Sequence, residues 1–484
     1  MGPEAAGNLL RRPVAACLLM EAGFLVLALP GLALPARLAA QLALFAVYLF
    51  VLRGLSRKPL EEGQLRAGLV LAVLFRLTLL FVAPFYSDDL YRYLWDGRVQ
   101  VAGGINPYLH APASEAVAPL RDGLFPRINH PDIPTLYPPV AQFLFALVAW
   151  IGPSVPALKG AMVICDLLLM ALLVRILGRV GLPGGQILIY AWNPLVIAEV
   201  AGNGHVDVLA VLLLIAGIHL IIGERSALST IVLGLAAGAK FLPILAFPVL
   251  ARRIRAWLLP VPFLVLAVVY LPYASAGAAL FRGLKEYAER WQHNDSLFSL
   301  LLGAMEFLNP TPVLKAGIAW MHGALGYPAW VEILYTYAYP VYLARIAAFL
   351  LAAALSGMLA WKRADPVRGT FILLGAVLLL SPTAHPWYFL WVAPFLALRP
   401  SRAWILLTGL VPLSYLDPGP VAGGEGEMAW VRWAEYLPFF ALLLSDAITS
   451  YRRRDPVTLF ELRQFPPGLR GDWPRKGRAG SSPP

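Results

Sequence analysis

Long apolar runs that end in arginine or lysine recur along the chain and leave few folds open to it. A bilayer core of ~30 Å needs about 20 helical residues, and the runs at roughly 14–34, 36–52 and 66–84 approach that length. With 59% hydrophobic residues, the composition excludes an ordinary set of soluble domains. The pattern predicts an all-α polytopic membrane protein with roughly 12–16 transmembrane or half-membrane helices.

The basic residues lie mainly in short clusters at the ends of these runs. A net charge of +11 could suit a nucleic-acid binder, but this placement indicates membrane topology, and no nucleic-acid partner is expected. Arg53, Arg57 and Lys58 put the second connection in the cytoplasm, which sends residues 85–139 to the extracytoplasmic side. We therefore expect a multi-pass protein of the inner (cytoplasmic) membrane.

The same pattern divides the chain into a membrane domain, residues 1–450, and a basic tail, 451–484. The tail has many Arg, Pro and Gly residues without an apolar period, so it is expected to be disordered on the cytoplasmic side. Within the domain, residues 85–139 form the first large outer loop and 275–297 the second.

Some apolar runs are too short for ordinary spans. Residues 138–152 predict a re-entrant or interfacial segment. Two pieces, 227–239 and 241–251, predict a hairpin of half-helices with Lys240 at its outer tip. The run 184–201, in contrast, predicts one outward span.

The polar intervals least suited to inert linkers all fall on the outer side in this topology. They are residues 85–139, 202–205, 281–296 and 383–388. A reaction centre at the membrane surface needs such convergence, because catalytic groups must meet where irregular backbone is sheltered by protein or water. The sequence therefore favours an enzyme whose active site lies on the extracytoplasmic face.

Residues 87–103 predict a helix at the membrane interface, capped by Ser87, with Asp88 and Asp89 in its first turn. Acids stabilise a helix N-terminus by ~0.3–1 kcal/mol, and Asp88 can pair with Arg92 one turn later, so a structural role is one interpretation. The other is catalytic, because a partly desolvated carboxylate at the mouth of a span gains the basicity of a general base.

Three cations, Arg92, Arg98 and Lys240, suit a phosphate through bidentate or point-charge contacts. Local roles are the alternative. Arg92 could bridge Asp88 and Asp96 within a polar stripe of the interfacial helix, and Lys240 could simply extend its amine to the membrane surface.

Aromatic and polar side chains of the later outer intervals could stack on a sugar or hold a leaving phosphate. They are Trp291, His293, Asn294, Asp295, His385, Trp387 and Tyr388. The aromatic belt of a membrane interface competes as an explanation for the two tryptophans and the tyrosine. In AGNGHVD, His205 and Asp207 could form a hydrogen-bonded pair.

A divalent metal is a further alternative, with His110, His130, His205 and Asp132 as the ligands at hand. No ligand spacing supports such a site, so no cofactor is firmly predicted and the metal stays an open alternative.

Several motifs between residues 80 and 400 carry a family resemblance. They read SDDLYRYLWDGRVQVAGGINPY, YPP, AWNPLVIAEVAGNGHVD, AKFLP, YAERWQHNDSLFSLL and SPTAHPWYFLW. In these the chain resembles the GT-C superfamily of integral-membrane glycosyltransferases, particularly bacterial polyprenyl-phosphate mannosyltransferases that act on lipoglycan precursors. The first motif also looks like that of the eukaryotic GPI-anchor mannosyltransferase catalytic subunit, whose acids are spaced Asp-x-Asp. Here the acids are adjacent, and Asp88 matches the catalytic aspartate better than Asp89.

The resemblance implies that a sugar, with mannose as the expected one, passes with inversion from a polyprenyl-phosphate carrier to an acceptor hydroxyl of a glycolipid or glycan. Phosphate is already a good leaving group, so the protein must mainly deprotonate the acceptor and stabilise developing charge. Asp88 is the expected base and Asp89 its partner or alternate. The residues expected at the donor phosphate or lipid are Arg92, Arg98, Lys240 and His385. Those expected at the sugar or acceptor are Tyr91, Asp96, Asn106, Tyr108, Tyr137, His205, Trp291, Asn294, Asp295, Trp387 and Tyr388.

Two interpretations that assign the chain to other classes of membrane protein stay open. A lipid or solute transporter or flippase would also show broken helices and a basic cytoplasmic face. It should place polar residues within its spans, where few occur: Glu21, Arg76, Asp166 and Glu199. A noncatalytic scaffold gives no reason for an acidic pair beside aromatic and cationic clusters. The sugar, the linkage and the acceptor are not determined by these residues.

Overall fold

The computed structural model describes residues 3–55, 60–325, 330–417 and 428–452, and its regular structure is helical. Within these ranges no β-strand is formed. The predicted all-α fold is therefore confirmed. The basic tail lies outside the described residues apart from its first two positions, where the last helix ends.

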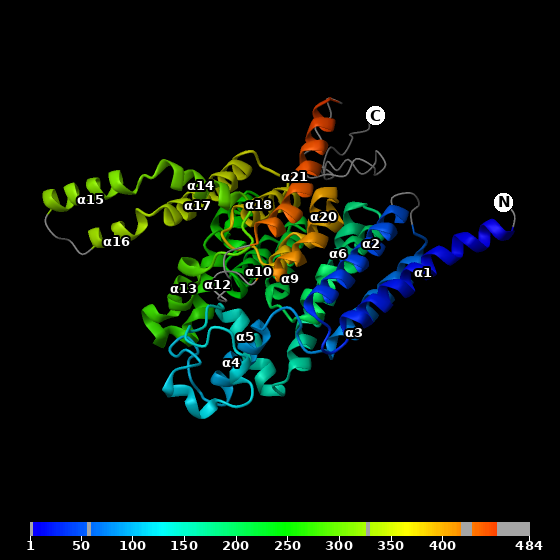
Figure 1. Cartoon of the computed structure of the whole chain (residues 1–484), viewed down its shortest axis with the longest axis horizontal. Helices are drawn as coiled ribbons and strands as arrows, with labels where there is room; N and C mark the ends of the chain where they lie inside the picture. Colours follow the sequence, from blue (N-terminus) through cyan, green and yellow to red (C-terminus); the bar gives the residue numbers. More distant parts are fainter. Residues whose placement is uncertain (1–2, 56–59, 326–329, 418–427, 453–484) are drawn as a thin grey trace, which may run out of the picture.

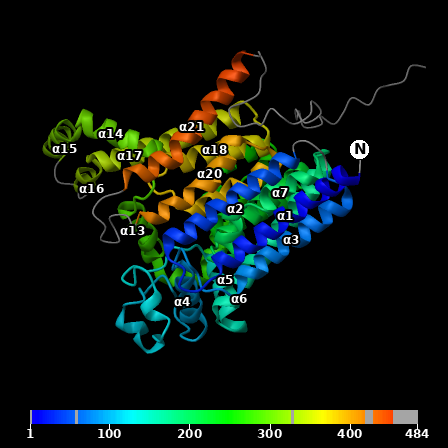
Figure 2. The ribbon, with the colours of Figure 1, turned by 45° about the vertical axis from the view of Figure 1, so that its right-hand side comes forward.

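Four long helices from the first half of the chain lie side by side along one flank of the molecule (Figure 1, Figure 2). They are α1 (Pro3–Leu27), α2 (Leu34–Leu55), α3 (Glu62–Leu80) and α6 (Val155–Val180). Local sequence explains both ends of α6. The Ser154 hydroxyl accepts the Ala157 N–H at 3.2 Å, and Gly181 ends the helix at a φ of 72°, where glycine is favoured.

The segments that follow α6 pack against this layer, most of them as shorter or broken helices. The elements nearest the centre are α7 (Ile187–Ala191), α8 (Pro194–Ile197), the π-helical turn η4 (Ala198–Gly202), α9 (Asp207–Ile222), α10 (Ser226–Ala239), α11 (Pro243–Ala251), α18 (Pro366–Leu380), η7 (Pro386–Trp391), α19 (Ala393–Leu398), α20 (Arg402–Leu410) and α21 (Ala429–Arg452). One continuous cluster of buried apolar side chains joins them to the first layer.

The remaining helices lie at the periphery or in loops. They are α12 (Val261–Tyr270), α13 (Arg282–Arg290), α14 (Leu297–Leu308), α15 (Thr311–Leu325), α16 (Trp330–Tyr337), α17 (Pro340–Trp361) and the 3₁₀ turns η1 (Glu115–Leu120), η2 (Phe125–Arg127), η3 (Gly184–Gln186), η5 (Ala256–Leu258), η6 (Leu271–Phe281) and η8 (Val411–Leu416). In Figure 1, α15 and α16 extend away from the body of the molecule.

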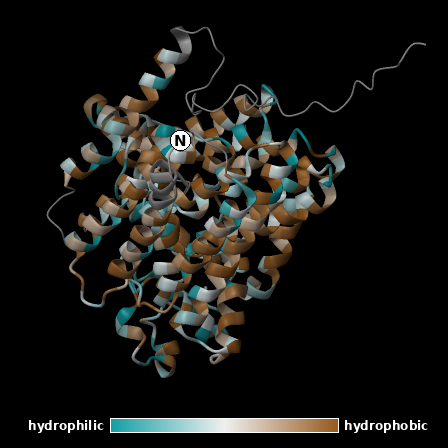
Figure 3. Ribbon diagram, turned by 90° about the vertical axis from the view of Figure 1, so that its right-hand side faces the viewer, coloured by the Kyte–Doolittle hydropathy of each residue, from teal (hydrophilic) through white to brown (hydrophobic). Residues whose placement is uncertain are grey.

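Among the described residues, five helical segments are long and apolar enough to cross a bilayer, or up to seven if each of two sharply bent pairs is one span. One of these pairs joins residues 194–202 to α9 with a bend of 120°. Figure 3 shows hydrophobic residues along the lengths of the helices and hydrophilic ones gathered mainly near their ends. The chain is thus a multi-pass membrane protein, as predicted.

The predicted short segments agree with the structure, whereas one predicted span does not. The two half-helices are confirmed as α10 and α11, and Lys240 lies in extended conformation directly after α10. Helix α5 (Pro139–Ile151) has the short length expected of a re-entrant segment. The prediction of one span over 184–201 was wrong. The helix is interrupted before Pro194, because proline lacks an N–H and disfavours helical conformation in the residue before it.

Helix α4 (Asp89–Val101) and the loop that follows it lie at the end of the molecule opposite to the C-terminal end of α21 (Figure 1). The helix begins two residues later than predicted. Its polar stripe does not face water, since Arg92 and Asp96 are only 6% and 2% exposed. Helix α5 covers it closely: a Cβ on Gly97 would lie 2.3 Å from the Phe145 carbonyl oxygen. The polar stripe of α4 therefore lies against protein, and the location of this helix at the membrane interface stays a prediction.

Candidate active site

Two adjoining cavities lie between α4, the outer loop and the broken helices. One, of about 260 Å³, is lined largely by polar and aromatic groups, and the other, of about 430 Å³, mostly by apolar side chains of α10, α11 and α18. Both are lined by the same five residues, Leu136, Tyr137, Lys240, Tyr287 and Tyr388. The larger volume lies within the range of about 300–1,000 Å³ that small-molecule sites have in proteins, and the smaller one lies just below it.

The acidic pair lines the polar cavity, and its two members are held differently. Asp89 accepts hydrogen bonds from Asn129 Nδ2 at 2.8 Å and from the Tyr137 hydroxyl at 3.5 Å. Asp88 is more exposed and makes no side-chain hydrogen bond to the helix that it precedes. Partial burial raises the pKa of the Asp88 carboxyl, the Asp89 charge raises it further, and Arg127 opposes both effects. An exposed carboxyl of raised pKa facing a cavity has the properties of a general base.

The purely structural interpretation of the acids finds little support in these contacts. Ser87 Oγ, rather than an acid, accepts the Asp89 backbone N–H, at 3.3 Å. The predicted Asp88 pair with Arg92 is absent from the ion pairs of the described chain, because Arg92 Nε instead bonds Asp96 Oδ1 at 2.9 Å. Asp88 thus keeps its carboxylate toward the cavity.

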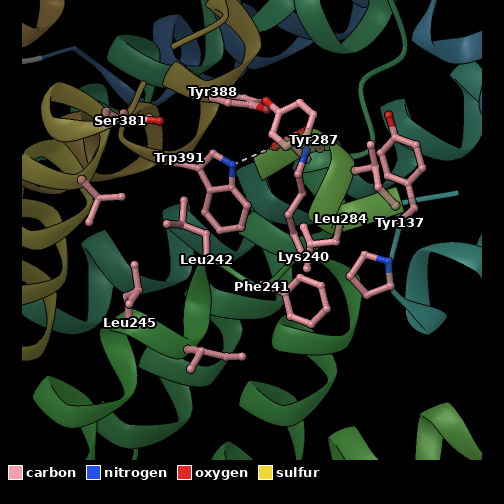
Figure 4. Close-up of a pocket in the computed structure, with 16 residues that line it drawn as sticks. Tyr137, Lys240, Phe241, Leu242, Leu245, Leu284, Tyr287, Ser381, Tyr388 and Trp391 are labelled. Atoms are coloured by element: carbon pink, nitrogen blue, oxygen red, sulfur yellow. Dashed lines mark hydrogen bonds and ion pairs between the residues drawn. The ribbon is translucent and has the colours of Figure 1, made fainter. Parts of the chain in front are cut away.

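Lys240 lies where the two cavities meet. Its Nζ is 2.8 Å from Asp207 Oδ2 and lies over the ring of Tyr388, 5.3 Å from the ring centre. Figure 4 shows the Lys240 side chain extending toward Tyr287 and Tyr388, while Leu242 and Leu245 line the other part of the apolar cavity. The Tyr287 and Tyr388 hydroxyls are hydrogen-bonded to each other. The junction therefore combines a cation with phenol groups beside an apolar space.

The later outer intervals contribute a stacked column of rings. Trp387 lies between two imidazoles, with its ring centre 4.2 Å from that of His205 and 4.3 Å from that of His385. His293 stacks on the far face of His385 at 4.7 Å. Burial lowers the pKa of His385 well below its usual range. This histidine is thus held neutral and can offer a phosphate one hydrogen bond but no charge.

The residues that the structure brings together come from all four predicted intervals. Those lining the polar cavity are Asp88, Asp89, Arg92, Tyr137, Lys240, Trp291, His385, Trp387 and Tyr388. His205 contacts this group from behind, 4.0 Å from Asp89. The predicted convergence of distant intervals is confirmed by this arrangement.

Other predicted site residues serve the scaffold. Arg98, expected at the phosphate, instead pairs with Asp122 at 2.5 Å in the outer loop. The Tyr108 hydroxyl is buried and donates to the Tyr137 carbonyl at 2.7 Å. Asn106 donates to the Tyr273 carbonyl at 3.0 Å. Their contacts shape the loop around the cavity rather than line it.

Four more predicted residues are used in internal contacts. Asp96 is buried between Arg92 and Gln142, whose Nε2 lies 3.0 Å away. Tyr91 accepts a hydrogen bond from Arg127 at 3.1 Å. Asn294 donates to Glu435 at 2.7 Å, and Asp295 pairs with Arg432 at 2.5 Å. The last two contacts tie the second outer loop to α21. None of the four lines either cavity.

The predicted pair of His205 with Asp207 is wrong. Asp207 bonds Lys240 and Trp391, whereas His205 faces Glu199 and Asp89. Glu199, expected as a charge within a span, instead lies at a bend beside the site, and the contribution of Tyr287 was not predicted from the sequence. The glycines and Asn203 around Glu199 in AEVAGNGH are the signal that could have marked a bend there.

Charged residues within the spans make internal contacts, which argues against a transport pathway through them. Arg76 bonds Asp166 at 2.5 Å with both side chains fully buried, and Glu21 accepts the Thr78 hydroxyl at 2.5 Å. Neither pair lines one of the two cavities. Across the part of the chain that the structure describes, no three His, Cys, Asp or Glu side chains are grouped so that they could hold a metal ion.

Known proteins resemble the chain over most of its length. Residues 8–256 match the family described as alpha-(1->6)-mannopyranosyltransferase, N-terminal domain, and residues 135–382 match glycosyltransferase family 87. The chain is 28% identical to alpha-(1->6)-mannopyranosyltransferase A of Mycobacterium tuberculosis, over 80% of this chain and 76% of that protein. It is 26% identical to a "probable alpha-(1->6)-mannopyranosyltransferase" of Mycolicibacterium smegmatis, over 82% and 76% of the two. No solved structure matches it.

Proposed function

Because the chain belongs to the alpha-(1->6)-mannopyranosyltransferase family and is a GT-C membrane glycosyltransferase, we propose that it transfers mannose from a polyprenyl-phosphate donor to an acceptor hydroxyl of a glycolipid or glycan. Mannose is supported by the names of both relatives. The donor class is inferred from the shape and lining of the two cavities.

The observation that carries this proposal is the position of Lys240 between an apolar and a polar cavity. A polyprenyl-phosphate sugar has the same order of parts: an apolar chain, an anionic phosphate and a polar sugar. With the prenyl chain beside Leu242 and Leu245, the phosphate would reach Lys240, and the sugar would enter the cavity that Asp88 and Asp89 line. A nucleotide sugar would have no use for the apolar cavity.

In the proposed reaction, Asp88 takes the proton of the acceptor hydroxyl while the acceptor oxygen bonds to the anomeric carbon. The bond from that carbon to the phosphate oxygen breaks, and the phosphate leaves with the electron pair toward Lys240 and the phenol groups of Tyr287 and Tyr388. Asp88 lines only the polar cavity, whereas Lys240 lies at the junction. Attack from the side opposite to the leaving phosphate inverts the anomeric configuration.

The acidic pair divides its tasks in this scheme. Asp88 is exposed and has a raised pKa, as a base that meets the acceptor requires. Asp89 is fixed by Asn129 and Tyr137, so its negative charge can stabilise an oxocarbenium-like sugar. Trp291, which also lines the polar cavity, offers a face on which a sugar ring can stack, whereas His205 and His385 cover both faces of Trp387.

We place this site on the extracytoplasmic side of the inner membrane. The long loop after α4 and the C-terminal end of α21 lie at opposite ends of the molecule (Figure 1), and the arginines that follow α2 and α21 in sequence favour the cytoplasm there. In this proposal residues 1–450 form one membrane glycosyltransferase domain, with outer loops at 85–139 and 275–297 and with 451–484 as a cytoplasmic tail.

The proposal is tested with purified protein reconstituted in liposomes, offered radiolabelled polyprenyl-phosphate sugars and a mannose-terminated glycolipid acceptor. We expect transfer from polyprenyl-phosphate mannose and none from a nucleotide sugar. Asp88→Asn should lower the transfer rate by at least about 100-fold, within the range for loss of a general base, with unchanged expression and thermal unfolding.

Other outcomes would redirect the proposal. Ordinary turnover in Asp88→Asn with an inactive Asp89→Asn would move the base to Asp89. Full activity in both variants would reduce the pair to structural groups, and transfer of arabinose in place of mannose would change the sugar.

A further inference from the structure

Two buried side chains to which the proposed reaction assigns no task lie behind the Asp89 carboxylate. Glu199 and His205 are both fully buried, and neither lines one of the two described cavities. His205 Nε2 lies 3.3 Å from Glu199 Oε2, and its Nδ1 lies 4.0 Å from Asp89 Oδ2. Neither ring nitrogen has a hydrogen bond of full geometry within the described chain. The imidazole thus stands between two carboxylates.

Neighbouring groups determine the orientation of this imidazole. Its ring is stacked on Trp387 with an angle of 11° between the planes. Because the nitrogens of an imidazole bond in the plane of the ring, the stacking directs them sideways, toward Glu199 and Asp89. Glu199 is itself fixed, since it accepts hydrogen bonds from the Tyr415 hydroxyl and from Asn203 Nδ2, each at 2.9 Å.

The backbone that carries Glu199 and His205 also holds the segment that leads into α4. Asn203 Oδ1 accepts the backbone N–H groups of Phe85 at 3.1 Å and Tyr86 at 3.0 Å. Gly204 has a φ of 78°, and a Cβ there would lie 2.4 Å from Leu90 Cδ1. The bend at residues 203–206 therefore contacts the chain on both sides of the acidic pair.

The helix type just before this bend also indicates a functional role for it. Residues Ala198–Gly202 form a π-helical turn, in which the Asn203 N–H reaches the Ala198 carbonyl at 2.8 Å. Such turns occur mostly as single insertions and frequently at functional sites. Here the turn brings Glu199 and Asn203 onto one side, where Asn203 contacts the segment before the acidic pair and Glu199 contacts His205.

We propose that Glu199 and His205 are positioning residues for the acidic pair, holding Asp89 from the buried side while Asn129 and Tyr137 hold it from the cavity side. The His205 ring closes the buried side of the Asp89 carboxylate, with Nδ1 4.0 Å from Oδ2, and so limits the positions that this carboxylate can take. The held Asp89 then presents a fixed negative charge beside Asp88 and the sugar. This inference rests on the proposed glycosyl transfer and adds the residues that prepare its catalytic group.

The test is a double-mutant cycle of His205→Ala with Asp89→Asn in the reconstituted transfer assay. His205→Ala should lower kcat by roughly 10–100-fold, the usual effect of losing a group that orients a functional ligand, while both KM values change by less than about threefold. His205→Gln, which keeps a hydrogen-bond donor, should recover part of kcat. The kcat of Glu199→Gln should lie between those of His205→Ala and the wild type. In the Asp89→Asn background, His205→Ala should cause no further loss, because residues that act through one group are not additive.

Control variants distinguish a failure of the positioning role from a failure of the proposed glycosyl transfer. His219→Ala, on α9 and outside both cavities, should keep wild-type kcat. If Asp88→Asn is inactive but His205→Ala keeps wild-type kcat, or if its loss adds to that of Asp89→Asn, the positioning role is wrong. If Asp88→Asn and Asp89→Asn both transfer normally, the acidic pair is structural and the positioning role fails with it; if the wild-type protein transfers no sugar from any polyprenyl-phosphate donor, the proposed function itself fails. Should His205→Ala unfold at a lower temperature, the same cycle is run with His205→Gln.

Discussion

Lys240 is bound to Asp207 by an ion pair of 2.8 Å between Nζ and Oδ2, and both side chains line the apolar cavity. Asp207 also accepts a hydrogen bond from Trp391 Nε1 at 2.8 Å. A lysine held in this way does not extend toward the membrane surface, which was the local alternative for it. The pair gives the apolar cavity a polar end, where an anionic head can exchange contacts with the ammonium group.

Replacement of Lys240 by methionine should raise the KM for the donor. A hydrogen bond to a charged group contributes about 1.5–3 kcal/mol, which corresponds to roughly 10–150-fold. Lys240→Arg should keep part of the activity, since arginine also binds phosphate. Initial rates over a range of donor concentrations measure the change, with the acceptor KM as internal reference.

The control for this prediction is Lys240→Met combined with Asp207→Asn. Removing one partner of a buried ion pair leaves the other charge uncompensated, which destabilises the fold by about 3–5 kcal/mol. If the single variant is weak only for that reason, the double variant recovers activity and Lys240 has no part in donor binding. We expect recovered stability without recovered donor affinity.

Filling the apolar cavity should discriminate donors by chain length. Leu245→Trp places a larger ring where the prenyl chain is expected, so the KM should rise several-fold for a long-chain donor and much less for a short-chain analogue. Leu264→Trp, on an exposed face of α12, is the matched control. Equal effects of Leu245→Trp on both donors would show that the chain binds elsewhere.

The acid limb of the pH profile should report Asp88. Its carboxylate is the active form, so activity is lost as the pH falls through its raised pKa, at a higher pH than for an ordinary aspartate of about 3.9. Arg127 lowers this pKa, so Arg127→Gln should move the acid limb to higher pH. Profiles of kcat/KM for wild type and variant measure the shift. A limb that does not move, or moves to lower pH, would contradict the assignment of Asp88.

Gly97→Ala should destabilise the contact between α4 and α5. The added methyl would meet backbone, 2.3 Å from the Phe145 carbonyl oxygen, and cannot be relieved by turning a side chain. Overpacking of this kind costs about 1–3 kcal/mol, measured as a lower unfolding temperature in detergent. Gly123→Ala in the outer loop, with nothing within 4 Å of its Cβ, should unfold like the wild type.

Much of the site could be anticipated because its signals are local in sequence. Charge bias at the ends of apolar runs placed the polar intervals on one side, and an acidic pair stood out in the first of them. Lys240, Tyr137, His385 and Trp387 follow from that convergence. The ion pairs of Arg98 with Asp122 and of Asp295 with Arg432 could not be anticipated. They depend on how the loops fold back on the helices.

By itself, the sequence determined the class of this protein: apolar runs of membrane length can bury their surface only in lipid and in one another, so a helical multi-pass fold follows. It also determined that a carboxylate pair begins the first long polar interval. Only the tertiary structure decided that Glu199 and His205 stand behind Asp89, and that Lys240 separates an apolar cavity from a polar one. Contacts of this kind depend on how helices distant in the chain pack at a bend or break, and hydrophobic period and charge bias carry no information about that.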